Sequence, residues 1–558
     1  MDVSTNAYDP VTRTLTGALP YILLLAAFFT WPIAIGLLSL YTRAVRRSMR
    51  SSGAHKASAT SAPVVETAPL AAHVEPVGRA ALYDLPAIAS TADNGRLLGL
   101  LIAGPRRAAI AYALGGGAYA LIMATAELLS GGMEFLPIRF SFLFWLHAWP
   151  VVLTTGIVAA ATRLHRLLLV VAYFIVLLAI AAMAMPASPD ATWGQVLQAW
   201  VMNNLPATLL MLTYLSRRVR ALGPLVLIFM VMALAGSYIP LYVAASDDRL
   251  LLAIVGVTGL FGLGGIGTFW AMRVLGFLTF GVMGWLALGW IRRKYQAKHI
   301  SDESVTIDAI WVLFAITDSI DLVFAHPLWA LTGVVAFAAY KSCVRLGLKW
   351  AGRGGDAGQR SPVLLVLRSF SIGKDGERLF DVVDRFWRRV GSIQMIAGVD
   401  LARRTVEPHE FLDFISGKLA RRFIDGSAEL EQRMQERDTR PDCDLRFRVN
   451  DFFCYDDTWK MVLSRLARDS DAVLMDLRGF SRENAGCVFE LGELARIVPL
   501  EQVVFVVDRR TDEKLLAETL GERRAGVYRL HSLNGRQIRD LMRALAAAAS
   551  PAPVATAP

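Results

Sequence analysis

The feature that most constrains this chain is a series of apolar runs, each about 20 residues long, that fills the sequence before Trp350. Helices of that length match the hydrocarbon core of a lipid bilayer. Hydrophobic residues make up 54% of the chain and charged residues only 19%, whereas soluble domains carry about 25% charged residues. The sequence after Trp350 reads as an ordinary soluble domain. We therefore expect a polytopic α-helical membrane domain followed by a soluble one.

About nine or ten apolar segments can be distinguished in this first part. They are 19–41, 108–129, 140–161, 167–185, 196–215, 222–245, 250–291, 307–324 and 328–344. The seventh is long enough for two spans, but its Gly-dense centre, GVTGLFGLGGIG, also suits a broken or re-entrant helix that leaves one net crossing. The number of spans is open by one or two for that reason.

Basic residues indicate the orientation of the chain. Arg43, Arg46, Arg47 and Arg50 follow the first run, whereas only Arg13 precedes it. By the positive-inside rule the N-terminus lies outside and the soluble domain lies in the cytoplasm, as in a multi-pass protein of the inner (plasma) membrane. The net charge of +10 has the same source. Nucleic-acid binding is not expected, because no basic stripe with interleaved aromatic residues is present.

Composition divides the chain into six parts. The expected parts are an N-terminal signal-anchor span (1–50), a flexible cytoplasmic linker (51–105), a multi-span membrane domain (106–350), a second linker (351–361), a cytoplasmic α/β domain (362–549) and a disordered tail (550–558). The first linker is expected because Ala, Ser, Pro and Thr dominate it without helical periodicity. The first apolar run lacks a basic segment before it and reads as an uncleaved anchor.

In the soluble part, short apolar runs alternate with amphipathic stretches. The runs predict strands at 363–367, 393–396, 445–449, 473–477, 503–507 and 527–530. The stretches between predict helices at 377–390, 409–424, 457–467, 485–498, 512–520 and 536–548. Strands that alternate with helices favour a parallel sheet in a three-layer α/β domain.

The segment with the clearest chemical content is AVLMDLRGFSRENAGCVFEL, residues 472–491. Asp476 and Arg478 follow an apolar strand, Ser481 lies in the turn after it, and Cys487 and Glu490 lie on the next helix. Open α/β sheets bind ligands beyond the carboxyl ends of their strands, where helix N-termini also point. We expect a ligand site at this edge.

This segment resembles TIR domains, in which a buried strand and a Ser-containing turn lead into a helix that opens with Trp-Cys-x-x-Glu-Leu. Cys487 and Glu490 match that motif, and Gly486 stands where the family has Trp. In the NAD-cleaving members the helix Glu is catalytic, so the resemblance assigns that role to Glu490. The same residues in a polytopic chain also resemble uncharacterised bacterial membrane proteins.

The resemblance implies NAD or another nucleotide as the ligand. Glu490 would act at the ribose, and Arg368 and Arg478 would neutralise phosphates. Asp457 follows the third predicted strand and is expected at the same sheet edge. The alternative is structural: Glu490 and Arg478 form a surface salt bridge, and Cys487 fills the core.

Other motifs carry less chemistry. The four cysteines form no C-x-x-C pair and have no His at metal-ligand spacing, so reduced thiols and no metal site are expected. Residues 262–267 match G-x-G-x-x-G, but no strand precedes them, which favours helix packing over dinucleotide binding.

Ionisable residues also occur within the apolar segments. They are Glu127, His147, Asp318 and Asp321. Asp318 and Asp321 are three residues apart and share one helix face. Such groups are costly in lipid, so they indicate either a proton or ion pathway or hydrogen bonds between helices.

Three functions remain open from the sequence. The favoured one is an integral membrane protein of signalling or defence whose TIR-like domain binds or cleaves a nucleotide, as a nucleotide glycohydrolase would. The second is a transporter or channel with a regulatory α/β tail. The third is a membrane scaffold without catalysis. In each case the lipid bilayer is a partner, and a homo-oligomer through the α/β domain is expected from the resemblance.

Overall fold

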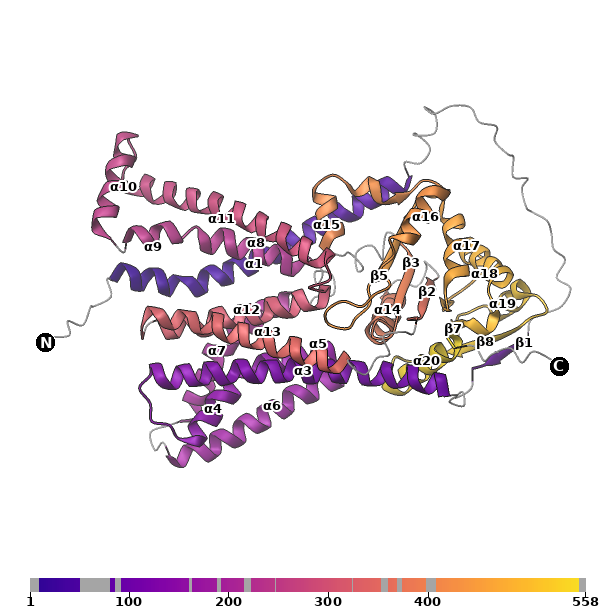
Figure 1. The fold of residues 1–558 in the computed structure, drawn as a ribbon, viewed down its shortest axis with the longest axis horizontal. Coiled ribbons are helices and arrows are strands. Elements are labelled where there is room, and N and C mark those ends of the chain that lie inside the picture. The colour runs from indigo at the N-terminus through magenta and orange to yellow at the C-terminus, as the bar shows by residue number, and fades with distance from the viewer. Residues whose placement is uncertain are drawn as a thin grey trace.

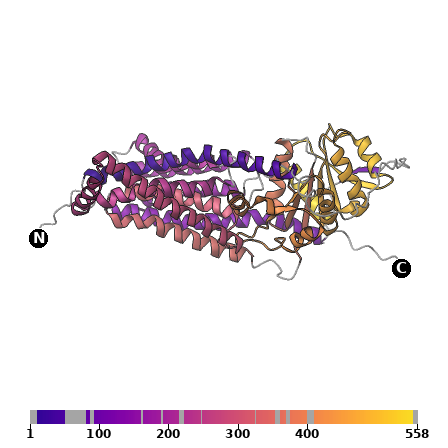
Figure 2. The same cartoon turned by 90° about the horizontal axis from the view of Figure 1, so that it is seen from above.

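The computed structural model describes residues 10–50, 81–85, 92–159, 163–187, 192–214, 222–245, 247–323, 325–352, 360–368, 374–397 and 408–550. Most of the two expected linkers and of the expected disordered tail lies outside these residues. The described chain forms a helical bundle and, at one end of it, a domain built on a parallel sheet (Figures 1 and 2).

The bundle consists of helices that run mostly along its long axis (Figure 1). They are α1 (Pro10–Arg50), α3 (Ala92–Ser130), α4 (Pro137–His147), α5 (Trp149–Val158), α6 (Arg163–Ala184), α7 (Trp193–Tyr214), α8 (Gly223–Gly236), α9 (Ile239–Ala245), α10 (Asp248–Leu260), α11 (Gly265–Gln296), α12 (Asp302–Val323) and α13 (Leu331–Gly352). The short 3-10 helices η2 (Met185–Ala187) and η3 (Pro327–Ala330) lie at turns.

Among the described residues, six helices are long and apolar enough to cross a membrane, by length and composition. The number rises to seven if α4 and α5, which meet at a bend of 41°, count as one span. This is fewer than the nine or ten segments expected from the sequence. The helices α7 and α12 reach 22 residues but are not among the six, and α12 contains five carboxylates.

The long apolar region 250–291 forms one short helix and one long helix. The 13 residues of α10 reach roughly 20 Å, too short for a bilayer core of about 30 Å, whereas the 32 residues of α11 exceed it. A turn with Gly262 at φ +71° joins them. Figure 1 shows α10 at the end of the bundle farthest from the sheet. One long helix, and not two, therefore returns toward the sheet here.

The other domain has strands and helices in alternation. The strands are β1 (Ala81–Asp84), β2 (Val363–Arg368), β3 (Ser392–Ile396), β4 (Phe423–Ile424), β5 (Val449–Cys454), β6 (Ala472–Asp476), β7 (Val503–Val507) and β8 (Arg524–Arg529). The helices are α14 (Lys374–Trp387), α15 (Pro408–Ile415), η4 (Leu419–Arg422), α16 (Ser427–Gln435), α17 (Trp459–Asp469), α18 (Ala485–Ile497), η5 (Leu500–Gln502), α19 (Glu513–Leu520) and α20 (Gly535–Ala548).

The described strands form one sheet in the order β1-β8-β7-β6-β2-β3-β5-β4, and all neighbouring strands in it are parallel. The chain runs outward from β2 through β3 in one direction and from β6 through β8 in the other. Strands β3, β2, β6, β7 and β8 thus have the doubly wound order 2-1-3-4-5. The order reverses between β2 and β6, which is where sheets of this kind open a crevice for ligands.

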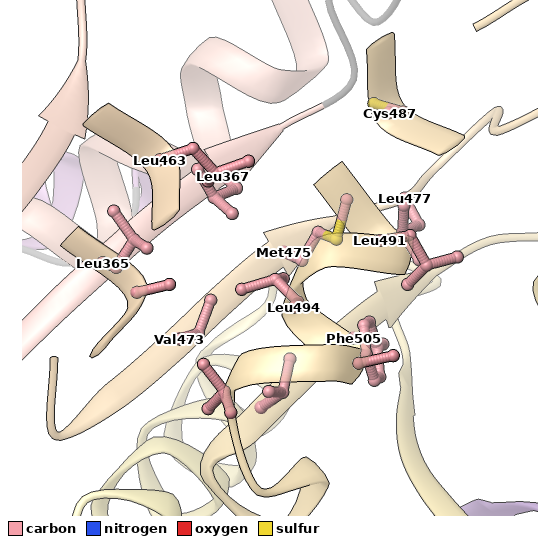
Figure 3. Close-up of a cluster of buried hydrophobic side chains, with 14 of the residues drawn as sticks. Leu365, Leu367, Leu463, Val473, Met475, Leu477, Cys487, Leu491, Leu494 and Phe505 are labelled. Atoms are coloured by element: carbon pink, nitrogen blue, oxygen red, sulfur yellow. The ribbon is translucent and has the colours of Figure 1, made fainter. Parts of the chain in front are cut away.

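Apolar side chains cover both faces of the sheet, which makes the domain three-layered as expected. On one face, α17, α18 and α19 pack against the strands, and Figure 3 shows Leu463, Leu491 and Leu494 among the side chains of this layer. On the other face, α14, α20 and the start of α3 supply the core. Strands with nearly every residue buried, such as Ala472–Asp476, are typical of a sheet covered on both sides.

Two predicted elements differ from the structure. The third predicted strand, 445–449, is displaced to β5 because Arg446 and Arg448 point into a buried ionic network, and Leu445 has φ +62°. The helix predicted over 409–424 ends at Ile415, and the chain then forms η4 and the edge strand β4.

An edge strand also forms within the expected linker 51–105. Residues Ala81–Asp84 pair with β8, and Leu85 continues the ladder through its amide to the Val527 carbonyl at 2.9 Å. The helix α3 then begins at Ala92, and its Leu101 is buried in the sheet core. The two strands β1 and β8 are more than 400 residues apart in the sequence, so local composition does not reveal their pairing.

Buried ion pairs join the bundle to the sheet domain. Arg388, directly after α14, donates to Asp302 at the start of α12 over 3.1 Å and to Asp384 over 3.3 Å. Arg446 contacts Glu303 of α12 and also Asp384, the latter at 3.2 Å. Both guanidinium groups and Glu303 are buried. We call these five residues the ionic junction.

Candidate functional site

The reversal point of the sheet brings two of the predicted residues together. Arg368 ends β2 and Asp476 ends β6, and they are register partners in the ladder. Both therefore lie at the carboxyl edge, where the sequence placed the ligand site. The side chain of Arg368 is outside the described part of the chain, so only its backbone position is established.

Asp476 and Arg478 form a buried bidentate ion pair. The Arg478 guanidinium donates to Asp476 through Nε at 2.8 Å and Nη2 at 2.7 Å. The two side chains are about 4% and 8% exposed. Removing one partner would leave the other charge buried, which costs about 3–5 kcal/mol. The pair fixes the direction of the guanidinium beyond the strand.

The loops after β6 and β7 are fastened to each other. Gly479, at φ +69°, donates its amide to Asp508 Oδ1 at 2.9 Å, and Arg510 Nε donates to Asp508 Oδ2 at 2.9 Å. Partial burial raises the pKa of Asp508, but the hydrogen bonds from the Gly479 amide and from Arg510 outweigh it and hold that pKa below its ordinary value. Asp508 is therefore a carboxylate at neutral pH, and the loops form a rigid rim.

A cleft of about 680 Å³ opens beside this rim. Its lining residues are Arg378, Arg478, Asp508, Arg509, Arg510, Leu530, His531, Ser532 and Leu533. They come from α14 and from the segments that follow β6, β7 and β8, so the cleft lies at the carboxyl edge of the sheet. Pockets for small molecules measure about 300–1,000 Å³, and this one falls within that range.

The cleft is cationic at one side and partly apolar at another. Four guanidinium groups line it; that of Arg478 is paired with Asp476 and that of Arg510 with Asp508, so the lining keeps an excess of positive charge. Leu530 is buried and Leu533 half-buried, so they offer an apolar floor. Two residues after Leu533, α20 begins with an N-cap at Asn534 that accepts from two backbone amides. Because Asn534 already occupies those amides, the guanidinium groups are what favours an anion such as phosphate here.

Ser481 lies in the turn that leads to α18. Its amide donates to Asn484 Oδ1 at 3.0 Å, and its hydroxyl contacts the same oxygen at 3.3 Å. Ser481 thus organises the start of the helix and does not line the cleft. Asp457 follows β5 and is exposed; β3 and β2 separate β5 from β6, so Asp457 is at the expected edge but away from the cleft.

Glu490 lies within the apolar layer under α18. Its side chain is buried, and Oε2 has no hydrogen-bond partner among the described residues. Burial raises the pKa of Glu490 from 4.5 to about 8, so the carboxyl is mostly protonated at neutral pH. Glu490 does not line the cleft, and the layer that contains α18 covers the sheet face opposite to α14 and α20.

The surface salt bridge between Glu490 and Arg478, which was the structural alternative, is not formed. Arg478 pairs with Asp476, and both Arg478 and Glu490 are buried. Cys487 is buried in the core, as that alternative expected (Figure 3). Among the described residues, no group of three His, Cys, Asp or Glu side chains has the arrangement of a metal site.

The bundle contains a second group of polar side chains. Glu127 and Asp318 both contact His147, and all three line a cavity of about 290 Å³. Asp321 lies on α12 as expected, but its side chain is outside the described part of the chain.

Sequence reasoning missed most of the residues that line the cleft. Asp508, Arg509 and Arg510 directly follow a strand that was predicted at 503–507, and His531 follows the strand predicted at 527–530. The rule that led to Asp476 therefore also applies to them. Arg378 had no such signal, because it lies one turn inside α14.

Comparison with known proteins finds no family model that matches the chain, and no curated protein or solved structure with significant similarity. The functional proposal therefore rests on the geometry of the site.

Proposed function

We propose that this chain is an integral membrane protein whose α/β domain binds a phosphate-bearing small molecule, such as NAD or another nucleotide, in the cleft at the carboxyl edge. The observation that carries the proposal is the set of four arginines around the cleft next to the point where strand order reverses. Guanidinium groups hold phosphate oxygens by paired hydrogen bonds, and Leu530 and Leu533 suit the less polar part of a nucleotide.

The surface of the bundle supports the membrane part of the proposal. Large apolar side chains face outward along it, for example Leu252, Ile266 and Val334, at 71%, 79% and 65% exposure. A soluble protein rarely exposes contiguous apolar surface on that scale. Lipid chains would cover these side chains, with the bilayer as the partner.

Basic residues support a cytoplasmic position of the α/β domain. Arg292, Arg293 and Lys294 lie at the end of α11, and Arg292 donates to Asp413 of α15 at 2.6 Å. These cations are therefore on the side of the sheet domain. In the positive-inside arrangement that side is the cytoplasm, where nucleotides are available.

Binding is better supported than cleavage. A carboxylate that stabilises a developing oxocarbenium ion must be ionised, whereas Glu490 is mostly neutral at neutral pH and is away from the cleft. The glycohydrolase version of the proposal, with the catalytic role of Glu490 that the TIR resemblance implies, requires α18 to move so that this carboxyl meets water and ligand.

A signalling role fits the connection between the two parts. Helix α14 carries Arg378 at the cleft and leads to Arg388 at the ionic junction, ten residues and about 15 Å further on. A ligand that displaces Arg378 would act on the same rigid helix that is paired with α12. We propose that the α/β domain reports ligand binding to the bundle, and that it also associates with a second copy.

The test is ligand binding to the full-length protein in detergent or nanodiscs, with NAD, ATP and pyrophosphate as probes. Arg509→Gln and Arg378→Gln should each weaken binding at least tenfold, since each removes a charged hydrogen-bond donor. Arg523→Gln is the matched control, because Arg523 is exposed and precedes β8 at the opposite edge of the sheet. Equal weakening by all three variants, or no binding by the unaltered protein, would refute the cleft as the site.

A further inference from the structure

A chain of hydrogen-bonding side chains crosses three helices inside the bundle. His147, at the end of α4, contacts Glu127 of α3 through Nε2 at 2.8 Å and Asp318 of α12 through Nδ1 at 3.2 Å. The Tyr119 hydroxyl, also on α3, donates to Asp318 Oδ2 at 2.8 Å. We call these four residues the bundle relay. It lies apart from the ligand cleft and does not depend on it.

The geometry of the imidazole sets the number of protons in the relay. A neutral imidazole carries one N–H, so it can donate to only one of the two carboxylates. The second short N–O contact is a hydrogen bond only if another proton is present, either on the ring or on a carboxyl. Without it, a nitrogen lone pair would face a carboxylate oxygen. The observed contacts therefore fit a relay that holds one proton beyond those of neutral histidine and two carboxylates.

The charges around the relay lead to the same conclusion. Two carboxylates carry two negative charges, and no Lys or Arg is among the described residues that line the adjoining cavity. The extra proton reduces the net charge from −2 to −1 in an apolar setting where unpaired charge is costly. Among the described residues, the other polar or titratable groups nearby are Tyr173 of α6, which donates to the Trp145 carbonyl, Ser130 of α3, and the amides of Asn203 and Asn204 of α7.

Access to the relay is one-sided. The Glu127 side chain is 34% exposed, whereas those of His147 and Asp318 are 4% and 3% exposed. The adjoining cavity of about 290 Å³ is also lined by Ser130 and Gly131, from the end of α3 farthest from the sheet. The relay thus leads from an accessible carboxyl to a buried one.

Aromatic rings close the other end. The Tyr119 ring packs edge-on against Trp311, with the centroids 5.0 Å apart, and Trp311 stacks on Tyr340 at 4.5 Å. All three side chains are fully buried. A proton that reaches Asp318 therefore meets these packed rings on the side of the sheet domain.

We propose that Glu127, His147 and Asp318 form a proton-binding site that takes up and releases one proton from the side opposite to the α/β domain. Glu127 is the entrance, His147 carries the proton between the carboxyls, and Asp318 is the inner acceptor. When the proton is lost, one imidazole nitrogen lone pair faces a carboxylate oxygen. This repulsion pushes α4 away from α3 or α12. The same geometry in a second state, open past Tyr119, would make the site part of a proton pathway.

The test is infrared difference spectroscopy of the full-length protein in liposomes, titrated between about pH 5 and about pH 9. We expect a band of the protonated relay, from the imidazolium ring of His147 or from a carboxyl, that disappears as the pH rises; the absence of any titrating band would overturn the proposal. Glu127→Gln and Asp318→Asn should each abolish or displace it, and Tyr119→Phe, which removes only the hydroxyl, should shift its midpoint. Glu134→Gln is the control, since Glu134 is an exposed carboxyl in the same α3–α4 connection.

Sodium is the competing cation, and the titration distinguishes it. Replacing K⁺ by Na⁺ in the buffer should leave the band unchanged if the site is specific for protons. A Na⁺-dependent loss of the band would show a sodium site and overturn the proposal. So would a titrating band that Glu127→Gln, Asp318→Asn and Tyr119→Phe all leave as it is in the unaltered protein.

Discussion

The guanidinium of Arg388, directly after α14, lies 3.1 Å from the carboxylate of Asp302 in the first turn of α12. Helix α14 also carries Arg378 at the cleft, and α12 also carries Asp318 in the bundle relay. Helix α14 thus connects the cleft to the ionic junction, and α12 connects the ionic junction to the relay. Asp302 and Asp318 are 16 residues apart, about 24 Å along a helix.

The ionic junction should contribute strongly to stability. Glu303→Gln leaves the buried guanidinium of Arg446 with Asp384 as its remaining carboxylate partner, and we expect a loss of up to about 3 kcal/mol. Thermal unfolding of the full-length protein in detergent measures it. Glu431→Gln breaks the exposed pair with Arg465, which water screens, and should leave the melting temperature nearly unchanged. Equal effects of the two substitutions would contradict the assignment of a buried network.

The buried carboxyl of Glu490 should make stability fall as the pH rises. Its pKa is about 8 in the folded chain, against an ordinary value of 4.5. Below about pH 4.5 the group is neutral in both states and has no effect. Between about pH 4.5 and about pH 8 the Glu490 carboxyl ionises in the unfolded chain but not in the folded chain. The free energy of unfolding therefore falls by up to about 5 kcal/mol over this range.

Glu490→Gln removes this dependence, because the amide does not ionise. The variant should match the unaltered protein near pH 5 and melt at a higher temperature near pH 9. Glu493→Gln is a control of opposite sign: a hydrogen bond from Arg496 lowers the pKa of Glu493, so its contribution is lost as the pH falls. If Glu490→Gln destabilises the protein at high pH, the carboxyl has an ionic partner in the folded state.

Two Gly→Ala substitutions should have opposite effects. Gly479 has φ +69°, which strains any residue with a Cβ, so Gly479→Ala should cost about 1 kcal/mol. It should also weaken ligand binding, because the Gly479 amide fastens the rim through Asp508. Gly492 lies inside α18 with open space around its added Cβ, so Gly492→Ala should stabilise by up to about 1 kcal/mol. Thermal melting and nucleotide titration check both; a stabilising Gly479→Ala would be inconsistent with the described turn.

Much of the α/β domain could be predicted, because its elements have strong local patterns. The strands β6 and β7 and the helix α18 begin and end within one residue of the predicted bounds, since the apolar runs are continuous and turn residues bound them. The strand at 445–449 was misplaced because Arg446 and Arg448 alternate with apolar residues as a strand would, although their burial serves ion pairs. The partner of Arg446 is Glu303 of α12, which is distant in sequence, whereas Arg448 pairs with Asp442 nearby.

The site was predicted in part for a similar reason. Position at the end of a strand is a local property, so Asp476 and Arg478 were found. The burial of Glu490 is not local, since it depends on how α18 lies in the apolar layer. The relay required knowledge that α3, α4 and α12 meet, because the sequence shows only that Glu127, His147 and Asp318 are polar residues in apolar surroundings.

The pairing of β1 with β8 has a consequence for how the protein is made. The ribosome completes residues 81–84 long before it reaches residues 524–529. Strand β1 therefore cannot pair with β8 until nearly the whole chain has been synthesised. During that interval Leu97, Leu100 and Leu101 of α3 have no sheet to cover. Biogenesis must therefore keep this segment from aggregating until translation is nearly finished. For the same reason a fragment that begins at Pro362 would lack one edge and part of one face, and should be less soluble than its composition suggests.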